Sequence, residues 1–214
     1  MYWSRPLRLR LNSSVRHQYQ NIMLTEESTA EVQLASRASR AIGAMFLAVF
    51  GGCWLVFWCL GVYGVKFGVL GVIGAGSAAI LLAAVRQFRD NRDAYAKEAE
   101  SPASKKNGRI FNVVNAIQWV LIFLVATFLR QAGHWEWIIP SVIFIVGVHF
   151  FPLAMAFRVR RHYLTGGAMI LLAVLYPFMS KSGPKAPVGC LATGIILWLS
   201  AIGGLIPRLN PKDA

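Results

Sequence analysis

The sequence predicts an all-α, polytopic integral membrane protein built as one bundle of six transmembrane helices. Two observations predict this fold. Of the 214 residues, 56% are hydrophobic and only 14% are charged, a composition unlike that of an ordinary soluble domain. The hydrophobic residues are also gathered in long continuous blocks, whereas the strands of a membrane β-barrel would alternate polar and apolar residues.

Six windows of about 18–23 residues contain no Lys, Arg, Asp or Glu, and a helix of about 20 apolar residues crosses the hydrocarbon core of a bilayer. Each window is therefore expected to be a transmembrane helix within a single domain over residues 41–207. The windows are residues 41–63, 67–85, 110–129, 138–157, 163–180 and 188–207.

Residues 1–40 are expected to form a tail before the first membrane helix. The sequence STAE at 28–31 matches a capping box, in which Ser28 caps a helix and Glu31 reaches back to its start. This pattern predicts an exposed helix over residues 29–40. The tail contains no apolar segment like that of a signal peptide, so the first membrane helix is expected to be the uncleaved targeting signal.

Residues 86–109 are expected to form a loop between the second and third membrane helices. Its first part, RQFRDNRDAYAKEAE, contains helix-favouring residues of both charges, which predicts a solvated extension of the second helix. Ser101 and Pro102 are interpreted as the end of that extension, followed by a flexible link, SKKNGR. Residues 208–214 are expected to form a short C-terminal tail.

The basic residues predict the orientation of the bundle. With six membrane helices, 18 of the 22 Lys and Arg residues fall on one side, and the positive-inside rule assigns that side to the cytoplasm. Both termini are therefore expected to be cytoplasmic. The four basic residues on the other side are Lys66, Arg130, Lys181 and Lys185.

The net charge of +13 follows from this distribution, and we do not interpret it as a nucleic-acid surface, because no basic stripe lies on a soluble module. The expected partners are the bilayer itself and anionic lipid head groups at the cytoplasmic face.

The first two membrane helices are rich in glycine, with a GxxxG at Gly64 and Gly68 and further glycines at positions 71 and 74. Small residues allow close helix contact, so these helices are expected to pack tightly and to offer a face for a homo- or hetero-oligomer.

The windows contain few groups that could perform chemistry. All nine Asp and Glu residues lie outside them, although a carrier coupled to protons or cations commonly places a carboxylate at mid-membrane. No HExxH, CxxC or GxSxG is present, so no metal, no cofactor and no catalytic residue is predicted. Cys53, Cys59 and Cys190 are expected to be free thiols.

Polar residues within the spans are concentrated in the third and fourth helices. Asn112, Asn115 and Gln118 follow one another at three-residue steps and form a slanting stripe. Counted inward from the cytoplasmic ends of an antiparallel hairpin, Gln118 and His149 come to the same depth, and this depth predicts a hydrogen bond between them, direct or through one water. Pro152 is expected to break the fourth helix and to free a carbonyl near Val148, which Asn115 would face.

The same region carries a resemblance. Phe111, Asn115 and Gln118 are followed by I-x-P at 138–140 and by IVG-x-HF-x-PLA at 145–154. With these motifs, residues 110–167 resemble a family of small bacterial integral membrane proteins of uncharacterised activity. The resemblance implies an inner-membrane helical fold, and it transfers no catalytic residue.

Three functions are compatible with these features. The first is a non-enzymatic membrane scaffold or partner subunit, in which Asn112, Asn115, Gln118 and His149 join helices through hydrogen bonds. The alternative is a small-solute transporter or channel-like protein with a polar cavity at His149. The second alternative is a membrane-embedded lipid-modifying enzyme that uses His149 as an acid or base.

Overall fold

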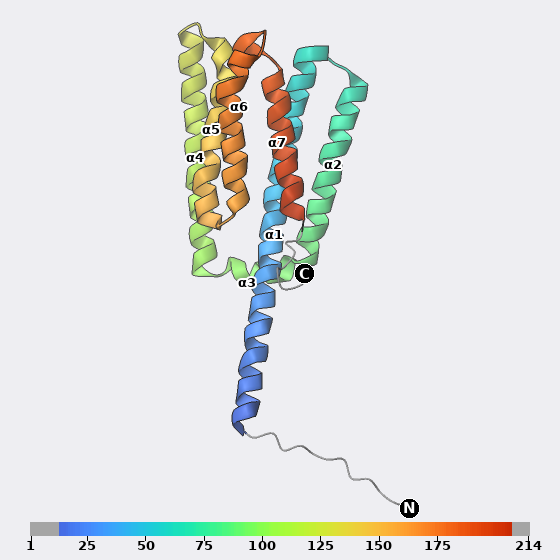
Figure 1. The fold of residues 1–214 in the computed structure, drawn as a ribbon, viewed down its shortest axis with the longest axis vertical. Helices are drawn as coiled ribbons and strands as arrows, with labels where there is room; N and C mark the ends of the chain where they lie inside the picture. The colour runs from blue at the N-terminus through green and yellow to red at the C-terminus, as the bar shows by residue number, and fades with distance from the viewer. Residues whose placement is uncertain (1–12, 207–214) are drawn as a thin grey trace, which may run out of the picture.

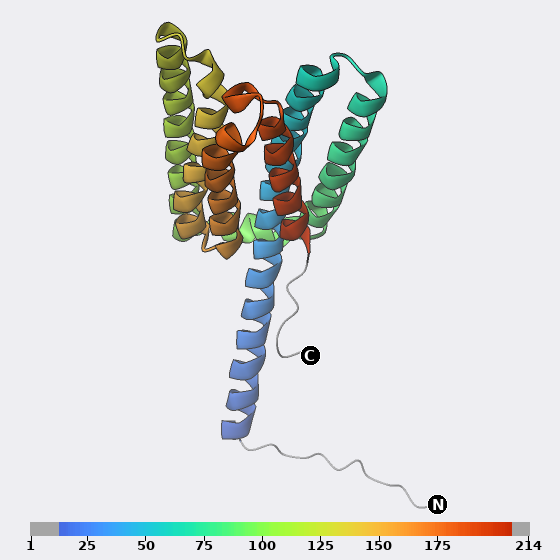
Figure 2. The ribbon, with the colours of Figure 1, turned by 45° about the horizontal axis from the view of Figure 1, so that its top comes forward.

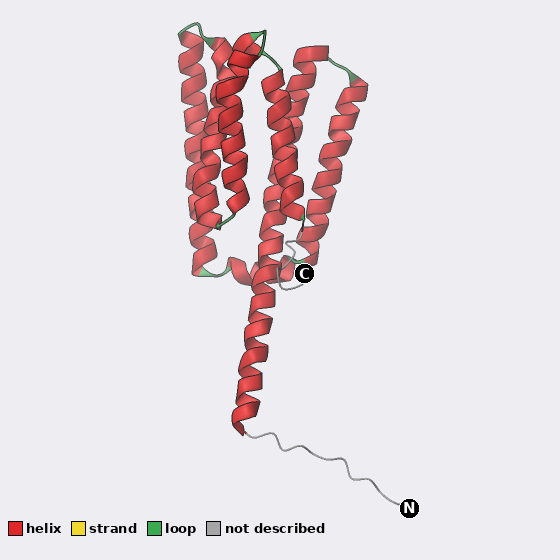
Figure 3. Cartoon of the chain, in the orientation of Figure 1, coloured by secondary structure: helices red, strands yellow, loops and turns green. Residues whose placement is uncertain are grey.

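The computed structural model describes the backbone of residues 13–206 and the side chains of residues 28–206, and this part of the chain contains helices and no strand (Figure 3). Six helices are long and apolar enough to cross a membrane. The predicted all-α fold is therefore confirmed, and the chain is a multi-pass membrane protein. The elements are α1 (Ser13–Tyr63), α2 (Phe67–Asp90), α3 (Arg92–Ala99), α4 (Pro102–Gln131), the 3₁₀ helix η1 (Trp135–Trp137), α5 (Ile138–Phe157), α6 (Arg160–Met179), the 3₁₀ helix η2 (Gly183–Lys185) and α7 (Val188–Leu205).

The links between the long helices lie at two opposite ends of the bundle (Figure 1). The α1–α2, α4–α5 and α6–α7 links lie at one end, whereas α3 and the α5–α6 link lie at the other, which we call the α3 end. Lys66, Arg130, Lys181 and Lys185 all fall in or beside the links opposite the α3 end. For the basic residues that the structure describes, the alternating helix directions thus separate the two sets that the sequence predicts to face opposite sides.

α1 is longer than the sequence predicts. It is one continuous helix from Ser13, so Ser28 lies inside it and the predicted capping box is wrong. No glycine or proline occurs between residues 13 and 42, and nothing in this segment therefore interrupts the helix. α1 extends well beyond the α3 end of the bundle (Figures 1 and 2). The rest of the predicted N-terminal tail, residues 1–12, and the predicted C-terminal tail lie outside the described residues.

The predicted loop at 86–109 is mostly helical. α2 ends at Asp90, and α3 then runs across the base of the bundle instead of extending α2 (Figure 2). Ser101 and Pro102, interpreted as the end of a helix, begin α4: Ser101 Oγ accepts a hydrogen bond from Ser104 N at 3.1 Å, and Pro102 occupies the first turn. Serine at the N-cap with proline at the first helical position is a favoured helix start, and the predicted flexible link SKKNGR is part of α4.

The bundle consists of two groups of helices, α1, α2 and α7 on one side and α4, α5 and α6 on the other (Figures 1 and 2). Within each group one pair of helices crosses at glycines. A Cβ on Gly51 of α1 would lie 3.1 Å from Gly194 O on α7, and a Cβ on Gly166 of α6 would lie 2.6 Å from Gly147 O on α5. Because the missing side chains let the backbones meet, these crossings fix the centre of each group.

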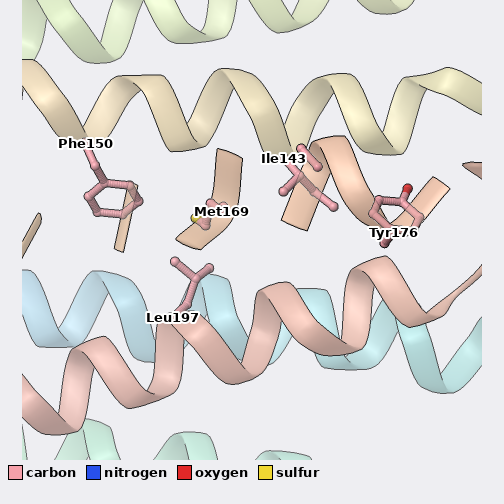
Figure 4. Close-up of a cluster of buried hydrophobic side chains, with 6 residues drawn as sticks. Ile143, Phe150, Met169, Tyr176 and Leu197 are labelled. Carbon is pink, nitrogen blue, oxygen red and sulfur yellow. The ribbon is translucent and has the colours of Figure 1, made fainter. Parts of the chain in front are cut away.

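The two groups share one apolar core between α5, α6 and α7. Ile143 and Phe150 extend from α5 toward Met169 and Tyr176 of α6, and Leu197 of α7 points into the same space (Figure 4). Ile143 and Met169 are completely buried. This cluster joins the two halves of the bundle, since α7 also packs along α1.

Candidate functional site

The predicted amide stripe lies on α4. Among the described residues, α4 is the only long helix that contains no buried residue. Asn112 is exposed, whereas Asn115 and Gln118 are half-buried. No hydrogen bond of the Asn112 or Asn115 side chain is found among residues 28–206. Along α4 the stripe therefore passes from an exposed position at Asn112 to half-buried positions at Asn115 and Gln118. Only the half-buried end of the stripe contributes to a candidate site.

His149 of α5 is half-buried and points to α4, because its imidazole lies within reach of the backbone of Val114. Gln118 Oε1 and His149 Nδ1 are both shielded from solvent, and within the described residues neither has a hydrogen-bond partner. The predicted direct hydrogen bond between these two side chains is therefore not found, and a bridge through one water stays a prediction. The imidazole instead lies near Val114, which is one helical turn before Gln118 on α4. The ends of the apolar windows in the sequence are therefore an imprecise reference for the depth of a side chain in the membrane.

Pro152 does not break the helix. α5 continues through it to Phe157 and ends where Arg158 adopts a left-handed conformation with φ 53°. Proline removes one backbone hydrogen bond, but in a span the flanking turns and the neighbouring helices retain the helical path. The predicted contact between Asn115 and the freed carbonyl near Val148 is not found among the hydrogen bonds of the described residues.

His162 is the residue that sequence reasoning missed. It lies on α6, and its ring centroid is 5.7 Å from that of Phe150, which in turn lies 6.0 Å from the ring of His149. The two histidines thus flank one buried phenylalanine on adjacent helices. His162 follows Arg160 and Arg161 and falls one residue before the fifth apolar window, so the sequence placed it with the basic link rather than in the membrane.

Three further hydrogen bonds of polar side chains connect different elements of the bundle. Thr165 of α6 and Ser200 of α7 share a hydrogen bond of 2.7 Å between their hydroxyls. Trp198 Nε1 of α7 donates to Ala48 O of α1 at 3.2 Å, and the Tyr176 hydroxyl donates to Pro184 O in η2 at 2.9 Å. The first two contacts join helices of the bundle and the third joins α6 to the link that follows it; such contacts between buried polar groups stabilise a helical bundle in lipid.

The side chains of Gln118, His149 and His162 can take part in hydrogen bonds, and the two histidines can also exchange protons. Among the described residues, no group of three or more His, Cys, Asp or Glu is arranged to bind a metal ion. Cys53 is exposed, Cys59 and Cys190 are buried, and all three are free thiols.

Comparison of this chain with protein-family models, with curated proteins and with solved structures finds no match. The resemblance of residues 110–167 to a family of bacterial membrane proteins accordingly stays a prediction, and the function has to be argued from the geometry alone.

Proposed function

We propose that the protein is a non-enzymatic membrane scaffold or partner subunit. The observation that supports this proposal is that polar side chains of the spans are used in contacts between elements: Thr165 with Ser200, Trp198 with Ala48 and Tyr176 with Pro184. Such contacts contribute about 0.6–2 kcal/mol each in lipid. They fix the helices relative to one another, as a subunit that presents a stable surface to a partner requires.

The partner surface in this proposal is the outer face of α2. Gly68, Gly71 and Gly74 lie there at three-residue steps, are exposed, and have no atom within 4 Å of a Cβ built on them. Small residues on a lipid-facing helix allow a second helix to approach its backbone closely. The partner is a transmembrane helix of an identical or different subunit.

Photo-crosslinking in the membrane tests this surface. A photoreactive residue at Val72, which is 72% exposed on α2, should give an adduct of discrete mass, and Gly71→Leu should abolish that adduct. Leu164 of α6, which is 76% exposed, provides the matched control and should give none. Equal adducts from both positions, or none from Val72, would contradict the proposal.

A solute site at His149 is a second candidate, and one observation favours it: Gln118 Oε1 and His149 Nδ1 are buried without partners among the described residues. Buried polar atoms are usually satisfied, so a water or a small neutral solute could supply the missing contacts. Proteoliposomes with purified protein should show no protein-dependent uptake of small neutral or anionic solutes if the scaffold proposal is right. Uptake that disappears in a folded His149→Gln variant would favour the solute site instead.

We also propose that the α3 end faces the cytoplasm of an inner membrane, with both termini on that side. The support is the excess of Lys and Arg at the α3 end, to which the positive-inside rule applies. A cysteine introduced at Ser104 should react with a membrane-impermeant reagent only from the cytoplasm, and one at Ser182 only from outside. Labelling of position 182 from the cytoplasm would reverse the assignment. The variants should carry Cys53→Ser, because Cys53 is exposed.

A further inference from the structure

A basic hollow lies at the α3 end, between α1, α2 and the last turn of α7. It has a volume of about 540 Å³, and three arginines from two helices contribute to its wall, a size within the usual range of about 300–1,000 Å³ for ligand pockets. Arg37 and Arg40 come from α1 and Arg86 from α2, while Ala83 and Leu205 supply apolar surface. None of these residues belongs to the polar region around His149.

The wall of the hollow is fixed by hydrogen bonds between side chains and backbone. Gln87 Nε2 of α2 donates to Arg37 O of α1 at 3.1 Å, which sets the position of the two helices relative to one another. Asn91 Nδ2 donates to Gln87 O at 2.7 Å at the end of α2. Arg37 and Arg86 therefore emerge from backbones that are connected, and their side chains line one space.

The charge of the hollow is not balanced by its own residues. One carboxylate, Asp90, lines it together with the three arginines. Among the described side chains, neither Arg37 nor Arg86 forms an ion pair. Two of the carboxylates elsewhere at this end have other partners: Asp93 lies 3.3 Å from Arg92, and Glu31 lies 2.6 Å from Lys97. Arg37 and Arg86 alone therefore outnumber the one carboxylate that lines the hollow.

We propose that this hollow binds a phosphate-bearing anion. A guanidinium offers its N–H donors in a planar fork that matches the oxygens of a phosphate, and the paired, charge-assisted hydrogen bonds are among the strongest in proteins. The hollow lies where the apolar part of α2 and α7 ends, so the head group of an anionic phospholipid can occupy it while an acyl chain lies against Ala83 and Leu205. A soluble phosphate compound has the same chemistry, and the experiment distinguishes the two sources.

The test uses the full-length protein in uncharged detergent micelles, with the midpoint of thermal unfolding as readout. The protein is titrated separately with short-chain phosphatidylglycerol, short-chain phosphatidylcholine and inorganic phosphate. Phosphatidylglycerol should raise the midpoint and phosphatidylcholine should not, because its choline cancels the phosphate charge. A rise with phosphatidylglycerol alone identifies a lipid head group as the ligand, and a rise with inorganic phosphate identifies a soluble anion. No rise with either compound overturns the proposal.

Two double variants separate the hollow from general surface charge. Arg37→Gln with Arg86→Gln should weaken the apparent affinity by about tenfold or more. The bond from Gln87 should survive, because it uses the backbone of residue 37. Lys105→Gln with Lys106→Gln removes the same charge from exposed positions of α4 outside the hollow, and it should leave the affinity unchanged. An equal loss in both double variants overturns the proposal.

Asp90→Asn provides an independent measurement, should the double arginine variant not fold. It removes the carboxylate of the hollow without touching an arginine, so it should raise the apparent affinity for the anion by about threefold. Weaker binding in this variant would contradict the proposal.

Discussion

Seven glycines of the membrane-spanning helices fall into two groups that look alike in sequence and differ in the structure. Gly51, Gly147, Gly166 and Gly194 lie at helix crossings where an added Cβ would meet backbone oxygens at 2.6–3.1 Å. Gly68, Gly71 and Gly74 lie on α2 with no atom within 4 Å of such a Cβ. The prediction that glycines pack the first two helices tightly is thus right for Gly51, Gly52 and Gly61 of α1 and for Gly76 of α2, but wrong for Gly43 of α1 and for Gly68, Gly71 and Gly74 of α2.

The difference shows what a small residue contributes in lipid. Lipid tails are as apolar as the side chains, so a glycine stabilises a contact only where a second backbone lies opposite it. The α1–α7 and α5–α6 crossings each have glycine on both helices, and the loss of side-chain volume is therefore matched by closer packing. At Gly68, Gly71 and Gly74 of α2 the same residue leaves only an open surface.

Gly166→Leu should break the first group most severely. The new side chain would begin 2.6 Å from Gly147 O and 2.9 Å from the ring of Phe151, so α5 and α6 would have to separate, at a cost of about 3 kcal/mol of unfolding free energy. The next residue provides the control, because a Cβ on Gly167 has no atom within 4 Å, and Gly167→Leu should be tolerated. The comparison is made by unfolding both variants in detergent, and equal destabilisation would show that the crossing is not as close as described.

Trp198→Ala should have the second-largest effect. The indole lies against Gly51 and Gly76 and donates its N–H to Ala48 O at 3.2 Å, so its removal leaves a cavity between α1, α2 and α7 and deletes that hydrogen bond. Since Trp198 is only half-buried, we expect a loss of about 2 kcal/mol, below the range for a fully buried tryptophan. Trp198→Phe should restore the packing and lack the hydrogen bond, and an unchanged unfolding midpoint in Trp198→Ala would refute this account.

Gly71→Ala should have the smallest effect on the isolated chain. The residue is exposed within α2 and has open space around it, and alanine favours a helix over glycine by about 0.5–1 kcal/mol. The unfolding midpoint should therefore stay the same or rise slightly, whereas Gly51→Ala, which would meet the Trp198 ring at 2.5 Å, should lower it. A clear loss of stability in Gly71→Ala would contradict this prediction, because it would mean that another helix packs against Gly71 in the purified protein.

Much of the fold could be predicted from local sequence, and the misreadings have local causes. The six spans and the alternation of basic links follow from composition. The start of α4 was misplaced because Ser101-Pro102 can end one helix or begin the next, and only the hydrogen bond from Ser104 N to Ser101 Oγ decides between them. The start of α1 was misplaced because a pattern that can cap a helix, STAE, also occurs inside one.

The candidate site was harder to predict, because it depends on the rotation of helices about their own axes. The sequence could identify Gln118 and His149 as unusual residues in apolar spans, but their relative position required the register between α4 and α5. The structure sets the imidazole against Val114 and adds His162 from α6 across Phe150. For the same reason Arg37 and Arg86 appeared in the sequence only as topology signals, whereas the packing of α1 on α2 brings them to one hollow.

By itself, the sequence determined that six segments are long and apolar enough to cross a membrane, because the cost of placing a segment in hydrocarbon depends on the composition of about 20 consecutive residues. Only the tertiary structure decided which glycines meet, which histidines approach each other and which arginines line a common space. Each residue turns a helix by about 100°, so the face that a side chain occupies is set by the neighbour against which the whole helix packs.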